Sequence, residues 1–144
     1  MGAQEGGHVM WERRQAELWD RIFQVTQDVV TLAETLPGSP GQRQLRAALL
    51  KCAMAVGAEL VRANAADSPG EFERCVREAR LKAIETDYWL RLVYVLQRKD
   101  SVQRDLSSII AQYASIIALL QRFLRHTQGE AHVVRRHGKG PLVS

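Results

Sequence analysis

The chain has 144 residues, of which 46% are hydrophobic, and it carries a formal net charge of +4. A chain of this length forms one domain with a sizeable core, and its mild basicity permits a polyanionic partner without requiring one. Two cysteines are too few for a disulfide framework, and we interpret both as reduced core thiols.

Neither end of the sequence indicates export or membrane insertion. The first residues lack the basic and then apolar pattern of a signal peptide. The longest apolar stretch, residues 109–120, is interrupted by polar residues and is too short to span a bilayer. We therefore expect a cytoplasmic protein with no membrane partner.

Apolar residues recur at three- and four-residue steps in four segments, which predicts four amphipathic helices. The first covers residues 11–36 and ends at Pro37-Gly38. The second starts with Ser39 as cap and Pro40 at the first helical position, and runs to about residue 66.

The third helix is predicted from a capping box in which Ser68 is the N-cap and Glu71 follows three residues later. It continues to about residue 98 without a break. The fourth begins at Asp100 or Ser101 and continues to about residue 127. The connections, near 37–40, 67–69 and 99–101, are so short that consecutive helices must be antiparallel neighbours. The prediction is an all-α, up-and-down antiparallel four-helix bundle over residues 11–127, without strands.

Both ends of the chain lack this periodicity. We expect a disordered N-terminus over residues 1–10 and a disordered basic tail over residues 128–144.

The third predicted helix carries a second apolar stripe on the side opposite its core stripe, and the second helix carries a shorter one. Exposed contiguous apolar surface usually marks an interface. We therefore expect a homo-oligomer whose interface joins Leu81, Ile84, Tyr88, Leu92 and Val95 to Leu50 and Met54 of another subunit. The alternative is that wide helices in a compact bundle bury more than half of their circumference.

Basic residues border these stripes. On the third helix they fall within an arc of about 60°, and the second helix is poor in acids. A row of arginines along a helix can follow the phosphates of DNA or RNA. The candidate nucleic-acid-binding residues are Arg77, Arg80, Arg91, Arg98, Arg43, Arg46, Lys51 and Arg62. The alternative is a solvated face whose arginines pair with Glu73, Asp87 and the acids of the first helix.

Catalytic and metal-binding patterns are not evident. The histidines are His8, His126, His132 and His137, all at or beyond the ends of the predicted helices. There are no paired Glu-x-x-His motifs on inner helix faces for a di-iron site, no zinc pattern around the two cysteines, and no glycine-rich phosphate loop. We expect no enzymatic activity, no metal and no cofactor.

The segment Ser68-Pro-Gly-Glu71-Phe72, followed by Ala79 and Glu85, resembles a family of bacterial four-helix bundles. The family is named after proteins encoded in intervening sequences of 23S ribosomal RNA genes. Residues 49–52 and 89–92 are similar to the accessory variability proteins of diversity-generating retroelements, which share that fold. The resemblance covers about residues 11–127. It implies a ring of five bundles and, for the retroelement proteins, a basic surface that binds nucleic acid and a reverse transcriptase.

Two functional hypotheses follow. In the first, the protein is a small, oligomeric, non-enzymatic accessory protein whose basic helix face contacts the backbone of DNA or RNA, with a reverse transcriptase as a further partner. In the second, it is a structural scaffold or protein-interaction module that uses only its apolar stripes.

Overall fold

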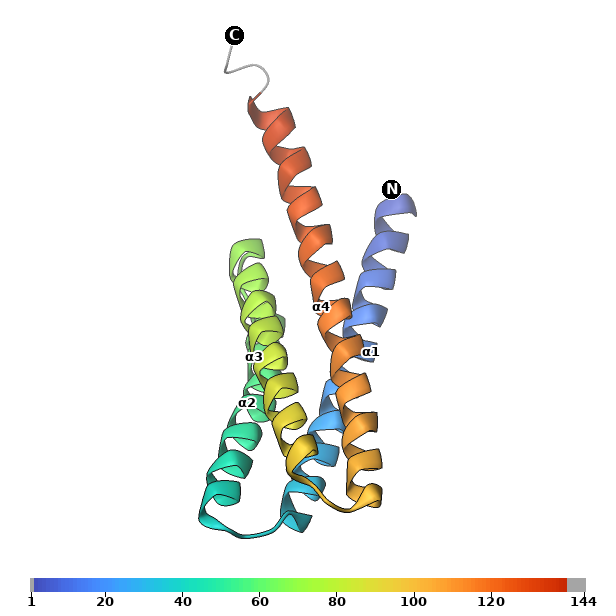
Figure 1. Cartoon of the computed structure of the whole chain (residues 1–144). Helices are drawn as coiled ribbons and strands as arrows, with labels where there is room; N and C mark the ends of the chain where they lie inside the picture. Colours follow the sequence, from blue (N-terminus) through green and yellow to red (C-terminus); the bar gives the residue numbers. More distant parts are fainter. Residues whose placement is uncertain (1, 140–144) are drawn as a thin grey trace.

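The computed structural model describes the backbone of residues 2–139 and the side chains of residues 13–125. It consists of the helices α1 (Gly2–Thr35), α2 (Pro40–Asn64), α3 (Pro69–Leu96) and α4 (Asp100–Lys139). Loops at residues 36–39, 65–68 and 97–99 join them, and each helix runs antiparallel to the one before it (Figure 1). The described chain contains no strand, and the predicted four-helix bundle is confirmed.

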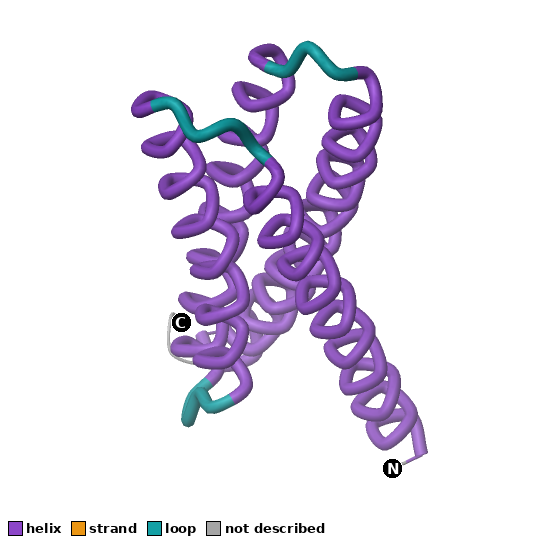
Figure 2. The backbone as a smooth tube through the Cα atoms, turned by 90° about the horizontal axis from the view of Figure 1, so that it is seen from below, coloured by secondary structure: helices purple, strands orange, loops and turns teal. Residues whose placement is uncertain are grey.

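The helices pack as the four sides of a square. α1 contacts α2 and α4, and α3 contacts the same two helices, so that α1 and α3 lie on one diagonal and α2 and α4 on the other. The tube view from below shows all the elements as helices joined by short loops (Figure 2). α2 and α3 are the most extensively packed pair, and the fully buried side chains of Ala53, Ala79 and Ala83 are small enough to let them approach closely.

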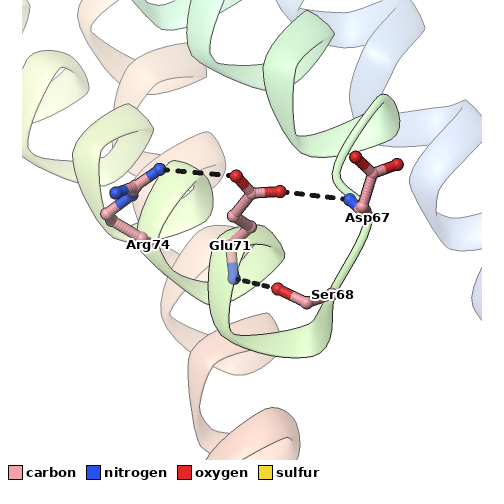
Figure 3. Close-up of polar contacts among 4 residues, drawn as sticks. All are labelled: Asp67, Ser68, Glu71 and Arg74. Atoms are coloured by element: carbon pink, nitrogen blue, oxygen red, sulfur yellow. Dashed lines mark hydrogen bonds and ion pairs between the residues drawn. The ribbon is translucent and has the colours of Figure 1, made fainter.

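The capping box predicted at the start of α3 is present (Figure 3). The Ser68 hydroxyl accepts a hydrogen bond from the Glu71 backbone amide at 3.2 Å. The Glu71 carboxylate accepts in turn from the backbone amide of Asp67 at 3.1 Å, one residue earlier than in the usual capping box. Arg74 lies 3.9 Å from the same carboxylate. The sequence signal therefore identified the right helix start and the right pair of residues.

Two loops are held by a side chain from the helix that follows. Arg46 of α2 donates to the carbonyl of Ala33 at 3.0 Å and to that of Leu36 at 3.5 Å, at the end of α1. Gln103 of α4 donates likewise to the carbonyls of Tyr94 and Gln97, at 3.3 and 3.1 Å, at the end of α3. These bonds satisfy carbonyls that have no partner within their own helix.

The core contains one apolar stripe from each helix. Val25 and Val29 of α1, Leu49 of α2, Leu90 of α3 and Tyr113 of α4 are among its fully buried members. Among the described side chains, Thr86 is the one buried polar residue of this core, and its hydroxyl donates to the Lys82 carbonyl at 2.7 Å. The bond lies within α3, and the helix continues through Thr86 without a break.

One segment of the described helices, Asp100–Arg125, is long and apolar enough by composition to cross a membrane. Its apolar residues include Leu106, Ile116 and Leu120, which are buried in the core of the bundle. Part of the apolar character of this segment therefore belongs to the core of the bundle.

The backbone of α1 begins at Gly2 and that of α4 continues to Lys139, beyond the limits of 11 and 127 that we expected for the bundle. No proline interrupts the sequence between residues 100 and 140, so nothing in the fourth segment forces an earlier end. At this end of the molecule α1 and α4 extend past the α2–α3 hairpin (Figure 1). The side chains of residues 1–12 and 126–144 lie outside the described residues, and disorder at the two ends of the chain stays a prediction.

Candidate nucleic-acid interface and oligomer surface

The apolar stripe on the outer side of α3 is exposed in the single chain. The exposed fractions are 44% for Leu81, 40% for Ile84, 62% for Tyr88 and 69% for Val95, and Leu92 between them is half-buried. We call these five residues the α3 stripe. Surface of this kind is available to a partner, and its role in assembly stays a prediction.

The two α2 residues predicted for the same interface differ in exposure. Met54 is 59% exposed, whereas Leu50 is half-buried and packs against the core. Only part of Leu50 is therefore available to another subunit.

The predicted arginine row of α3 is present on the side of that helix that faces α4. Arg77 donates to Glu73 at 2.7 Å and Arg91 donates to Asp87 at 2.9 Å, one helical turn away in each case. These are two of the acids that the alternative interpretation named, so half of the row is already neutralised within the chain.

The other two arginines of the row make no ion pair with a described residue. Arg98 is exposed beside the loop that leads to α4. Arg80 is half-buried, and its Nε is buried without a hydrogen-bond partner among the described residues. Their positive charge is therefore not balanced by a nearby carboxylate of the described chain.

The basic residues predicted on α2 do not join this row. Arg46 is half-buried and bound to carbonyls at the end of α1, which gives it a structural role. Arg62 pairs with Glu59 on its own helix. Arg43 and Lys51 are exposed, and at about 100° per residue they lie about 80° apart on the side of α2 away from the α3 row. The structure separates the predicted binding residues into the α3 row and a scattered α2 set.

α4 adds arginines that the sequence reasoning missed. Arg104, Arg122 and Arg125 are exposed, and none makes an ion pair with a described residue. Gln103 contacts the end of α3 and Ser115 contacts Arg21 of α1, which fixes the orientation of α4. By helical position Arg104 and Arg122 lie within about 20° of Ser115 and point outward on the α1 side, whereas Arg125 is turned toward α3.

The sequence signal for these arginines was their spacing. Residues 104, 122 and 125 share one side of a helix. Between them that side carries Ala111, Ala114 and Ala118, which are exposed and too short to keep a large partner away. We call the combined surface the α3–α4 basic face. It consists of Arg77, Arg80 and Arg91 of α3, Arg98 of the loop that follows, and Arg125 of α4.

The two cysteines lie in different environments. Cys75 is buried in the core as predicted. Cys52 is only half-buried, so the prediction of a core thiol is wrong for it, and its Sγ donates to Glu85 Oε2 across the α2–α3 contact at 3.3 Å. Burial and the neighbouring Glu85 carboxylate both raise the pKa of the Cys52 thiol.

The described residues form no enclosed site for a substrate or a metal that we can identify. A hollow lined by Leu18, Leu60 and Phe72, among others, has a volume of about 20 Å³, which is room for roughly one water. In the part of the chain with described side chains, no three His, Cys, Asp or Glu residues come together as metal ligands. The features that the structure does bring together are a basic face and apolar surfaces.

Comparison with known proteins gives a family and a fold. Residues 14–122 match the family described as "23S rRNA-intervening sequence protein". A crystal structure from Bacteroides thetaiotaomicron, of a protein with unknown function from the S23 ribosomal protein family, superimposes with a TM-score of 0.67 at 22% identity. The match covers 74% of this chain and 97% of that one, and at this identity it shows the shared fold alone. A search of curated proteins finds no match. Since the family match spans most of the bundle, the chain belongs to the 23S rRNA-intervening sequence protein family.

Proposed function

We propose that this protein is a small, non-enzymatic, cytoplasmic accessory module that binds the backbone of DNA or RNA through the α3–α4 basic face, as a homo-oligomer. The observation that carries the proposal is the pair of exposed basic side chains on that face without a described acidic partner, Arg98 and Arg125, beside the α3 arginines. Exposed arginines of this kind release counterions when they contact phosphates, which drives binding without reading base sequence.

Oligomerisation strengthens the proposal because it repeats the face on every copy. A single bundle offers a modest basic patch, and several copies in one assembly contact one polyanion at several points. The resemblance to the family makes five copies the first number to test. Through the retroelement proteins, it also makes a reverse transcriptase the protein partner to test.

The assembly is tested first. Wild-type protein at micromolar concentration should sediment as an oligomer. Ile84→Glu places a charge in the α3 stripe, where burial without a partner is costly, and should sediment as a monomer with unchanged helical content. Ser108→Glu, at an exposed position of α4 away from the stripe, is the matched control and should remain oligomeric. A monomeric wild-type protein would remove oligomerisation from the proposal.

Nucleic-acid binding is tested by titrating DNA and RNA at two salt concentrations. The double variant Arg98→Gln, Arg125→Gln removes two unpaired charges from the face. Its affinity should fall, and the slope of log affinity against log salt should flatten by about 1.5 to 2, since each lost phosphate contact contributes about 0.7 to 0.9.

A matched double variant, Arg104→Gln, Arg122→Gln, removes the same total charge from exposed positions of α4 outside that face. It should change the slope much less. Equal effects of the two variants would mean that net charge, rather than the α3–α4 basic face, controls binding. Truncation after residue 127 tests the basic tail separately, and complete loss of binding on truncation would contradict the role of the face.

The second candidate is the scaffold, and a specific observation favours it. Arg77 and Arg91 already pair with Glu73 and Asp87, as expected of a solvated face, while the α3 stripe stays exposed. An oligomer that binds neither DNA nor RNA at low salt would establish this reading.

A further inference from the structure

A second apolar surface lies on α1 and α2. On α1, Trp19 is 37% exposed, Phe23 64% and Val30 38%. On α2, Met54 is 59% exposed and Val61 53%. We call these five residues the α1–α2 apolar face. The sequence analysis assigned only Met54 of this group to an interface.

The members of this face turn to the same side of the bundle. Trp19 of α1 and Asn64 of α2 line one open groove between the two helices, and Arg46 of α2 binds a carbonyl at the end of α1. Asn64 and Arg46 therefore mark the side of α2 that faces α1. By helical position Met54 and Val61 lie 60–80° farther round from that side, toward solvent. On α1, Phe23 and Val30 lie within about 40° of Trp19. The two exposed rows therefore lie on the same side of the bundle.

This face and the α3 stripe lie on opposite sides of the molecule. α1 and α2 form one side of the four-helix square, and α3 with α4 forms the other. By helical position the α3 stripe points directly away from the core, on the outer corner of the square. Two copies that paired α3 stripe to α3 stripe would leave both α1–α2 apolar faces uncovered. Pairing one kind of face with the other covers both in every copy and gives a head-to-tail arrangement.

Length and charge both fit this pairing. The α1 row from Trp19 to Val30 extends about 16 Å and the α3 stripe from Leu81 to Val95 about 21 Å, at 1.5 Å per residue. Charges without a described ion-pair partner border both surfaces. Acids lie along the α1 edge and bases along the α2 edge of the α1–α2 apolar face, while the α3 stripe has a base on its α4 edge and an acid on its α2 edge. These residues are Asp20 and Glu34 of α1, Arg43 and Lys51 of α2, and Arg80 and Glu78 beside the α3 stripe.

We infer that the α1–α2 apolar face binds the α3 stripe of a second copy of this chain, with opposite charges facing each other along both edges. The inference rests on the proposed homo-oligomer and specifies which surfaces meet. Every copy then uses two different faces. Because each contact joins an α1–α2 apolar face to an α3 stripe, a change in either face alone disrupts all the contacts between copies.

A mixing experiment tests the pairing. Phe23→Glu disables the α1–α2 apolar face and Ile84→Glu disables the α3 stripe, both at exposed helical positions that tolerate glutamate. Each variant alone should sediment as a monomer. Mixed in equal amounts they should form a one-to-one heterodimer of twice the monomer mass, because each still carries the face that the other needs.

Met54→Glu and Tyr88→Glu repeat the experiment with independent variants, and circular dichroism confirms that each remains helical. Thr31→Glu, exposed on another side of α1, is the matched control and should assemble like wild-type protein. Oligomers formed by Phe23→Glu or by Met54→Glu alone would overturn the inference while leaving the proposed oligomer intact. Monomers that do not pair on mixing would also overturn it. A monomeric wild-type protein would instead remove the oligomer itself.

Discussion

The Tyr113 hydroxyl lies in the core of the bundle without a hydrogen-bond partner of normal geometry. It faces Thr26, whose own hydroxyl is already bonded to the Ile22 carbonyl at 2.6 Å. Burial is the main cause that raises the pKa of Tyr113 above its ordinary value near 10. The folded state thus favours the neutral phenol more strongly than the unfolded chain does.

This predicts a loss of stability in alkali that depends on Tyr113. Below about pH 10 the phenol is neutral in both states, and above it the unfolded chain ionises first, so the free energy of unfolding falls as the pH rises. Tyr113→Phe should make this fall shallower between about pH 9.5 and 11 in urea titrations. At pH 7 it should be neutral or stabilising by up to about 1 kcal/mol, because it removes an unpaired buried hydroxyl.

Tyr88→Phe is the control, since the Tyr88 ring is exposed in the single chain and its replacement should leave the pH dependence unchanged. An identical alkaline fall in Tyr113→Phe and wild-type protein would show that the buried hydroxyl makes no contribution.

Cys52 gives a second prediction about a single residue. Its thiol donates to the Glu85 carboxylate, so loss of the proton would place two negative charges together. In a Cys75→Ser background, Cys52 should react slowly with iodoacetamide at pH 8. Glu85→Gln should accelerate the reaction severalfold by lowering the pKa of the thiol. Equal rates in the two proteins would mean that burial alone controls the thiol.

Among the helices, α2 offers a test of backbone cost. Gly57 is within the helix, and a Cβ placed there would meet nothing within 4 Å. Gly57→Ala should therefore stabilise the monomer by about 0.5–1 kcal/mol, measured by urea unfolding of a monomeric variant such as Ile84→Glu. Ala58→Gly, at the exposed neighbouring position, should destabilise by a similar amount. A loss of stability in Gly57→Ala would contradict the open surroundings of this position.

The helices themselves could be predicted almost completely from the sequence. Ser39-Pro40 and the Ser68–Glu71 pair define the starts of α2 and α3 through local chemistry, which does not depend on tertiary contacts. Arg46 could not be assigned in this way. Its position suggested a surface base, and its bonds to the ends of α1 depend on how two helices meet across a loop.

For the whole molecule, periodicity predicted the bundle but not the composition of its faces. A chain of four antiparallel helices can turn in either of two directions, and the direction decides whether a given side of α3 faces α2 or α4. For this reason the arginines of α3 and α4 could not be joined into one basic face from the sequence, and the place of the α2 bases on another part of the surface could not be seen. The apolar residues of α1 were missed because, among the described residues, only three large ones lie exposed outside its core stripe.

The tight packing of α2 against α3 has a consequence for how the chain folds during its synthesis. The two helices are consecutive, joined by a short loop, and bury their alanine-lined faces against each other. Contacts between such near neighbours in the chain form quickly, because little chain entropy is lost in closing the loop. We expect this hairpin to form on the ribosome before α4 has been made. α1, which packs against α2 and α4, would keep part of its apolar side uncovered until translation ends, and the nascent chain would be most prone to aggregation in that interval.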